Sequence, residues 1–241
     1  MLNKLLLLLT GSPQLDATGS SGCRVASSSY TFTIVCSGGS PKPGIIAGVA
    51  CLTVGGTVSS ISSDLIGSFT KALAASNGLA DSEIWYLAAP AVGTHTLTVT
   101  LSGAITSDSA AASYFAVDQS SPIGVTGSNT GTGTNISDAI STGTDGSFVF
   151  DHVATSNKTL VATSPSVERW NTVCVPGSGA ASDQGLINPA GAVTMAWTGI
   201  GALDVWAHTM AEIKPYIAPS TSFTAIIRRT LGLRVGSRTK N

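Results

Sequence analysis

Three histidines are the side chains in this sequence best suited to acid–base chemistry, since imidazole is the group that changes charge near neutral pH. They are His95, His152 and His208. His95 and His152 fall in the apolar register of two strand-like stretches, THTLTVTLS and SFVFDHVA. This position favours histidines packed in a core or an interface over metal ligands or general bases.

Catalytic motifs do not accompany these histidines. The sequence contains no G-x-S-x-G nucleophile elbow, no H-E-x-x-H zinc motif and no phosphate-binding P-loop. We therefore predict that the protein is not an enzyme and that it uses no cofactor.

Paired carboxylates are the second arrangement that could support catalysis, because glycoside hydrolases use two of them as acid and base or nucleophile. The candidate pairs are Asp81 with Glu83 and Asp118 with Asp151. Asp81 and Glu83 alternate on one strand face, which is also where two solvent-facing acids would lie. No EF-hand or nonapeptide pattern indicates a calcium site. We assign no catalytic and no metal-binding residue.

The stretch FAVDQSSPIG, residues 115–124, ends an apolar run abruptly. It could hold a site built around Asp118, or it could be a corner between two sheets. The corner is favoured because an aspartate accepts hydrogen bonds from the backbone N–H groups that follow it, in an Asx turn. Pro122 keeps the residue before it extended, and Gly124 frees the backbone to enter the next sheet.

Exposed aromatic side chains could stack on sugar rings. The candidates are Trp85 and Trp170, and Trp170 is the better one because it follows charged Glu168 and Arg169 near a loop. Trp197, in the apolar register of AVTMAWT, is predicted to fill the core. An exposed tryptophan would allow host-surface glycans as partners.

The low charge and its uneven distribution indicate contacts with other subunits. Charged residues make up 10% of the chain, against roughly 25% in ordinary soluble domains. Residues 218–241 hold five cations and no acid, whereas the rest of the chain has seven basic and thirteen acidic residues. A basic tail can dock on the acidic body of a neighbouring copy. Residues 224–241 contain no aromatic side chain to stack on a base, so no specific nucleic acid is predicted.

The two ends of the chain are predicted to be arms that bind a partner. The leucine run of residues 5–9 is shorter than a signal-peptide core and far shorter than a membrane span. Exposed leucines would promote aggregation, so we expect them to be buried against another molecule. Apolar residues between the arginines of the tail suit a strand added to a neighbour's sheet edge. The predicted partner-binding residues are Leu5, Leu6, Leu7, Leu8, Leu9, Ile226, Ile227, Arg228, Arg229, Arg234 and Arg238.

Strand patterns dominate the region between the arms. In YTFTIVC the apolar residues alternate with threonines, and the same period-2 pattern in THTLTVTLS indicates one buried and one wetter face. The only candidate helix is 64–75, which could equally be a pair of strands. The fold class is therefore all-β: a single antiparallel β-sandwich of jelly-roll or Greek-key type over 21–217, with arms at 1–20 and 218–241. The predicted strands are 30–36, 44–54, 83–88, 94–102, 112–118, 136–140, 147–154, 159–163, 168–174, 192–198 and 205–213.

Four cysteines, Cys23, Cys36, Cys51 and Cys174, form no C-x-x-C pair, which argues against a zinc site or a redox dithiol. Cys36 and Cys51 lie in strongly apolar strands and are predicted to be small buried side chains. A disulfide stays open, and the spacing assigns no pairing.

Several segments in order carry a family resemblance: GIIAGVACLTVGG, EIWYLAAPAVGTHTLTVTLSGA, FAVDQSSPIG, ERW and AVTMAWT with EIKP. Together they resemble a functionally uncharacterised β-sandwich domain found in bacteriophage structural proteins and in secreted bacterial proteins. The resemblance covers roughly residues 28–215, and VDQSSPIG is its most specific part. The family has no established catalytic residues, so it implies a structural or recognition role and a virion or extracellular location.

The expected function is that of a non-enzymatic virion structural protein, a capsid-decoration, head, tail or fibre component that contacts copies of itself or other virion proteins through its arms. The alternative is a secreted carbohydrate-binding or adhesion module at the cell surface.

Overall fold

The structure, a computed structural model, describes residues 10–37, 43–52, 55–65, 67–156 and 158–217. The described chain contains strands, turns and bends but no helix, which confirms the all-β prediction. The strands are β1 (Thr10–Gly11), β2 (Gln14–Cys36), β3 (Gly44–Cys51), β4 (Val58–Ser63), β5 (Thr70–Ser76), β6 (Asp81–Ala88), β7 (Gly93–Phe115), β8 (Ile123–Thr132), β9 (Ile136–Ser141), β10 (Ser147–Ser156), β11 (Val161–Ala162), β12 (Val167–Val173), β13 (Gly177–Ile187), β14 (Ala192–Thr198), β15 (Val205–Ile213) and β16 (Tyr216–Ile217).

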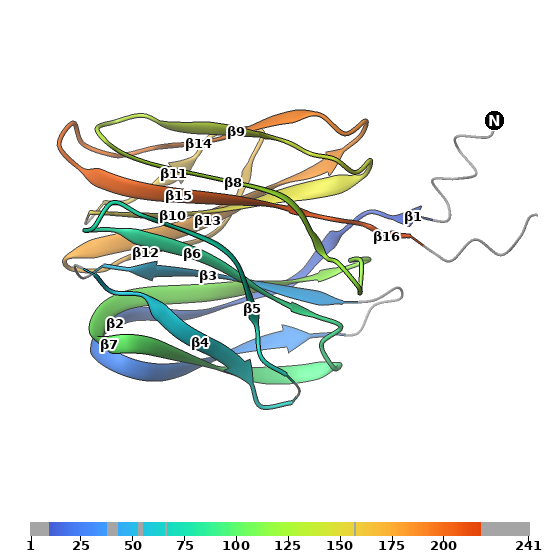
Figure 1. Cartoon of the computed structure of the whole chain (residues 1–241), viewed down its shortest axis with the longest axis horizontal. Coiled ribbons are helices and arrows are strands. Elements are labelled where there is room, and N and C mark those ends of the chain that lie inside the picture. Colours follow the sequence, from blue (N-terminus) through green and yellow to red (C-terminus); the bar gives the residue numbers. More distant parts are fainter. Residues whose placement is uncertain (1–9, 38–42, 53–54, 66, 157, 218–241) are drawn as a thin grey trace, which may run out of the picture.

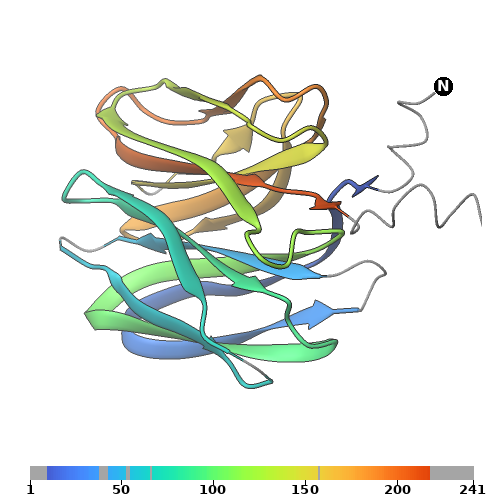
Figure 2. The same ribbon diagram turned by 45° about the vertical axis from the view of Figure 1, so that its right-hand side comes forward.

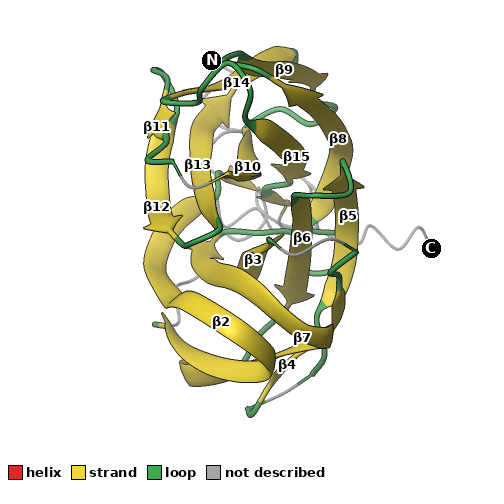
Figure 3. Cartoon of the chain, turned by 90° about the vertical axis from the view of Figure 1, so that its left-hand side faces the viewer, coloured by secondary structure: helices red, strands yellow, loops and turns green. Residues whose placement is uncertain are grey.

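Antiparallel sheets stack on one another to form the sandwich (Figure 1). The first sheet has the order β2-β7-β3-β6-β5, with β4 also paired to β7. The second has the order β12-β13-β10-β15-β8, and the third the order β11-β14-β9. The long strands β2 and β7 bend. The second part of β2, the first part of β7 and β4 therefore form a further layer below β3 and β6 (Figures 1 and 3).

The bend of β2 follows from local irregularities in its pairing. The β2–β7 register shifts between Arg24 and Ser27 and again between Ser27 and Ser29. Ala26 and Gly22 both have positive φ. Bulges of this kind bend a strand and increase its twist. The curled first sheet thereby encloses a core of its own.

The alternating apolar side chains of β2 and β7 form the core that the first sheet encloses. Tyr30, Phe32 and Ile34 of β2 are buried, and the threonines between them are exposed, as the period-2 pattern predicted. Leu97 and Val99 of β7 meet them in the same cluster. A second apolar cluster lies between the first and second sheets, and others lie between the second and third sheets.

The second half of the chain repeats the strand order of the first. The order β2-β7-β3-β6-β5 corresponds strand for strand to β8-β15-β10-β13-β12. The pairing of β4 with β7 corresponds to that of β11 with β14. The pairing of the second part of β2 with the first part of β7 corresponds to the pairing of β9 with β14. The sandwich is thus built from two copies of one arrangement, packed through the first and second sheets.

Sequence fragments accompany this repeated topology. Ser12-Pro13 comes shortly before Thr18-Gly19-Ser20 at the start of β2, and Ser121-Pro122 comes shortly before Thr126-Gly127-Ser128 in β8. Pro90 and Pro189 precede the corresponding strands β7 and β14. These matches support an internal duplication as the origin of the fold.

Several predictions about the elements differ from the structure. The predicted strand 94–102 and most of the predicted strand 112–118 are parts of one strand, β7, and strands β8 and β13 were not predicted. Residues 10–20 were predicted to belong to an arm, but Gln14 already pairs with Phe115 and Thr10 pairs with Ile217. This Ser-, Gly- and Thr-rich stretch has little apolar alternation, and its ladder with β7 is what holds it. Of the two alternatives for 64–75, the helix is wrong and the strand alternative fits, because Thr70–Ser76 is strand β5 at the edge of the first sheet.

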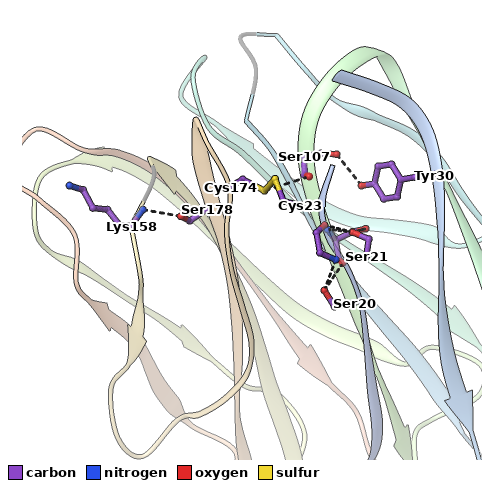
Figure 4. Close-up of a disulfide and its surroundings, with 10 residues drawn as sticks. Ser20, Ser21, Cys23, Tyr30, Ser107, Lys158, Cys174 and Ser178 are labelled. Atoms are coloured by element: carbon purple, nitrogen blue, oxygen red, sulfur yellow. Dashed lines mark hydrogen bonds between the residues drawn. A yellow bond between two sulfur atoms is a disulfide. The ribbon is translucent and has the colours of Figure 1, made fainter. Parts of the chain in front are cut away.

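One disulfide links the two halves. Cys23 of β2 is bonded to Cys174, which follows β12, with a Cα–Cα distance of 5.4 Å (Figure 4). Cys23 is exposed and Cys174 is buried. Cys36 and Cys51 are buried, as predicted.

Removing this disulfide should destabilise the protein. The bond joins residues 151 positions apart. Closing so long a loop restricts the unfolded chain, which typically raises the free energy of unfolding by about 2–4 kcal/mol. Cys23→Ala with Cys174→Ala should lower the free energy of unfolding by that amount in guanidinium titrations. A reducing agent should have the same effect on the wild type and none on the double variant. Equal stability of wild type and variant would contradict the prediction.

Candidate functional site

His208 lies between two carboxylates in the core between the second and third sheets. Its Nδ1 is 2.7 Å from Asp138 Oδ2 and its Nε2 is 2.9 Å from Asp151 Oδ2. Asp151 also accepts a 2.7 Å hydrogen bond from Trp197 Nε1 and two more from the backbone N–H and hydroxyl of Ser182. His208 and Asp151 are completely buried.

This arrangement holds His208 as an imidazolium. Burial by itself lowers the pKa of His208, but the hydrogen bonds and charges of Asp138 and Asp151 outweigh it and raise the pKa to about 9. The pKa of Asp138 is lowered, since the hydrogen bonds from His208 and Asn129 outweigh its partial burial. In this cluster His208 and Asp151 are completely buried, and the side chain of Asp138 is 11% exposed.

His152 lies on the opposite face of β10, between the first and second sheets. Its Nδ1 is 2.8 Å from Ser82 Oγ, which is also 2.8 Å from Thr209 Oγ1. Burial lowers the pKa of His152 to about 3, so the imidazole is neutral. A serine beside a histidine resembles a nucleophile with its base. Here both side chains are fully buried, and the pair has no access to a substrate.

His95 is also a core residue, as its register predicted. Its Nδ1 is 2.7 Å from Ser63 Oγ and its Nε2 is 2.7 Å from the carbonyl oxygen of Ala91. Both ring nitrogens therefore have partners within the first sheet and its loop.

The pair Asp81 and Glu83 is buried, not solvent-facing. Glu83 accepts hydrogen bonds from the backbone N–H of Val58 and from Trp85 Nε1, and Lys71 Nζ lies 2.7 Å from its Oε2. Burial and the charge of Glu83 raise the pKa of Asp81 to about 7. Strand β6 is covered on both faces, which its own alternation does not reveal.

Asp118 forms the predicted corner. Its Oδ1 accepts hydrogen bonds from the backbone N–H groups of Ser120 and Ser121 at 2.8 and 3.0 Å. These bonds outweigh a small effect of burial and lower the pKa of Asp118. Asp118 lies at this corner and Asp151 lies in the His208 cluster, so the second predicted carboxylate pair makes no common site.

The tryptophans proposed as a sugar platform are in the core. Trp170, predicted to be the exposed one, is 8% exposed, and Trp85 is 6% exposed. Trp170 packs beside Phe150 and His152, because the first sheet covers the face of β12 that carries it. Trp197 is buried, as predicted.

A cleft opens at the end of the sandwich where β3, β10 and β13 meet. Its volume is about 410 Å³, within the usual range of roughly 300–1,000 Å³ for ligand sites. The aliphatic side chain Leu79 at its rim is 53% exposed. We call this end the cleft pole. The cleft is lined by Leu52, Leu79, Ala80, Thr155, Ser156, Pro176, Gly177 and Val205.

The opposite end, which we call the terminal pole, carries the ribbon of β1 and β16. Thr10 pairs with Ile217 and Gly11 with Tyr216, so the two strands lie side by side there (Figures 1 and 2). The predicted partner-binding residues lie outside the described residues, in 1–9 and 218–241. The segments that contain them are joined to the body at adjacent positions.

Comparison with protein-family models, with curated proteins and with solved structures finds no match in any of the three. The family resemblance carried by VDQSSPIG stays a prediction.

Two searches within the described residues bear on ligands and membranes. No three side chains of His, Cys, Asp or Glu gather there in a way that could hold a metal ion. That part of the chain also has no helix long and apolar enough to cross a membrane.

The charged state of His208 predicts a pH-dependent stability. Its folded pKa of about 9 lies above the ordinary 6.5. The stability from its proton is therefore fully present below pH 6.5 and is lost as the pH rises through 9. Between those values the wild type should lose about 3 kcal/mol that His208→Gln does not lose. Urea titrations of both proteins at four pH values measure this, and parallel curves would contradict it.

Asp108 should add a second loss over a different pH range. Complete burial raises its pKa from 3.8 to about 8, although the backbone N–H of Gly179 acts in the other direction. Stability present below pH 3.8 should be lost as the pH rises through 8, by on the order of 5 kcal/mol. Asp108→Asn should flatten the pH profile and make the variant more stable than the wild type at pH 8. A variant that is less stable at pH 8 would refute this.

Proposed function

We propose that the protein is a non-enzymatic structural component of a bacteriophage-like particle and that it assembles through the segments 1–9 and 218–241. Its partners are copies of itself or other proteins of the same particle. The observation that carries the proposal is the pairing of Thr10 with Ile217. That pairing joins both segments to the body at the terminal pole, where they can act together on one neighbour.

Charge complementarity supports the same proposal. The segment 218–241 holds five cations and no acid, and the remainder of the chain has thirteen acids against seven cations. Six of these acids are buried, so the attraction between the body and a basic segment of another copy rests on the net charge of the body and weakens as salt screens it. The buried acids are Asp81, Glu83, Asp108, Asp151, Asp183 and Glu212.

The use of polar side chains inside the fold argues for a passive body. His152, His208, Asp151 and Glu83 are fully buried and bonded to other side chains of the chain. Polar side chains that are buried and bonded in this way stabilise a rigid body. They leave mainly small polar residues on its outer surface.

The disulfide between Cys23 and Cys174 favours a location outside the cytosol. Such bonds persist in secreted proteins and on virion surfaces and are rare in reducing compartments. It therefore supports a virion or extracellular location and fits the alternative, a secreted adhesion module, equally well. A glycan-binding version of that alternative loses its tryptophan platform, because Trp85 and Trp170 are buried.

Deleting residues 218–241 should abolish assembly and leave the sandwich folded. Light scattering after size-exclusion chromatography should show an oligomer for the full chain and a monomer of unchanged thermal midpoint for the truncated one. A matched variant with Arg228, Arg229, Arg234 and Arg238 changed to Gln separates charge from length. Normal assembly of the truncated chain would overturn the proposed mechanism.

A further inference from the structure

We propose that the cleft receives the leucine run Leu5–Leu9 of a second copy, so that copies join with the terminal pole of one on the cleft pole of the next. This inference rests on the proposed function and specifies one of its contacts.

The chemistry of the cleft fits an aliphatic segment. The eight residues that line it include no charged side chain. Thr155 Oγ1 already donates a 2.9 Å hydrogen bond to the carbonyl oxygen of Val205. The side chain of Leu52, which is 6% exposed, packs against Gly177. What the cleft offers a partner is therefore mainly apolar surface, and covering such surface is favourable in water.

The rim extends this apolar surface outward. Leu79 is 53% exposed and Val175, next to Pro176 of the lining, is 73% exposed. The turn that carries Leu79 is held in place, because Asn77 Nδ2 donates a 3.0 Å hydrogen bond to the carbonyl oxygen of Trp206. A fixed turn presents its leucine without a cost of ordering it on binding.

Corresponding parts of the two halves build this cleft. The β5–β6 turn brings Leu79 and Ala80, and the corresponding β12–β13 turn brings Pro176 and Gly177. The end of β3 supplies Leu52, and the end of the corresponding strand β10 supplies Thr155. The cleft thus lies on the seam between the halves, at the end of the strands opposite the β1–β16 ribbon.

Chain length determines whose leucines can reach it. Strand β10 has ten residues and runs from the terminal pole, where Gly146 lies close to Ser12, to the cleft. Ten residues of strand span about 33 Å. Leu5 is five residues before Thr10 and reaches at most about 18 Å from it. The leucine run of one copy therefore cannot enter its own cleft, but it can enter the cleft of a copy placed in line.

The basic segment is a poorer occupant of the same cleft. Residues 218–241 are long enough, at about 80 Å when extended, to reach either cleft. Their arginines find no acidic partner among the lining residues. We therefore assign the cleft to the leucines and not to the arginines.

Contacts of this kind use two different surfaces, so they are heterologous and do not close after two copies. Copies joined in line would form an open row along the strand direction. Such a row suits a tail or fibre component.

Complementation of two variants tests the contact in the full chain. Leu6→Asp with Leu8→Asp removes the apolar segment and keeps the cleft. Leu79→Lys with Ser156→Lys blocks the cleft and keeps the segment. Each variant alone should be monomeric by light scattering, and their mixture should form a complex of twice the 24.2 kDa chain mass. Val161→Lys with Val167→Lys places the same charges on side chains 55% and 51% exposed and should assemble like the wild type.

The outcomes separate this contact from the proposed function. Suppose that the wild type assembles and that the leucine-run variant and the cleft variant each still assemble normally. The leucine contact is then wrong and the proposed function stands. If both variants are monomeric but their mixture forms no complex, the leucine contact is also wrong. If the wild type is monomeric at every concentration, the proposed function fails first.

Discussion

The close apposition of the first and second sheets is the constraint on which the rest of the structure depends. Strand β3 is buried on both faces along its whole length. The sheets approach so closely that a Cβ on Gly48 would lie 2.5 Å from His152 Cδ2. An interface of this kind needs small residues, and it favours an internal partner for a polar group that it covers. Asp183 illustrates the second need, since it accepts a bond from Tyr114 and two from Arg169.

The repeated strand order of the two halves accounts for the extent of the interface between the first and second sheets. Each half offers one sheet to the other, and each half also has a core of its own. The arrangement resembles a symmetric dimer whose two subunits have been joined into one chain. The polar clusters of the two halves differ, with Glu83 and Lys71 in the first half and His208 with its two aspartates in the second. The shared topology therefore does not dictate which charged groups are buried.

Period-2 alternation predicted the strands with regular apolar faces, such as β10, β14 and β15, because alternation decides which side chains share a face. It missed β8 and β13, which are rich in Gly, Ser, Thr and Ala and have little apolar alternation. Alternation did not reveal that β6 is covered on both faces, and the charged neighbours of Trp170 wrongly indicated an exposed side chain. Both errors arise because burial depends on which sheet lies above a strand, a tertiary property. The sequence also left the Cys23–Cys174 pairing open, because residues 151 positions apart meet only in the folded chain. The Ser-Pro and Thr-Gly-Ser fragments that recur at β2 and β8 can be read from the sequence. They would have indicated the repeated arrangement. The cleft, which arises where the two halves meet, has no such signal.

The β1–β16 ribbon has a consequence for the covalent connectivity of the fold. The corner at Asp118 connects the end of the first half to the start of the second, and the ribbon brings the end of the second half beside the start of the first. The two junctions are equivalent in space, although only one is a peptide linkage. The contacts within the folded body therefore do not depend on which half comes first in the chain. A circularly permuted chain, opened at the corner and closed at the ribbon, would contain the same contacts.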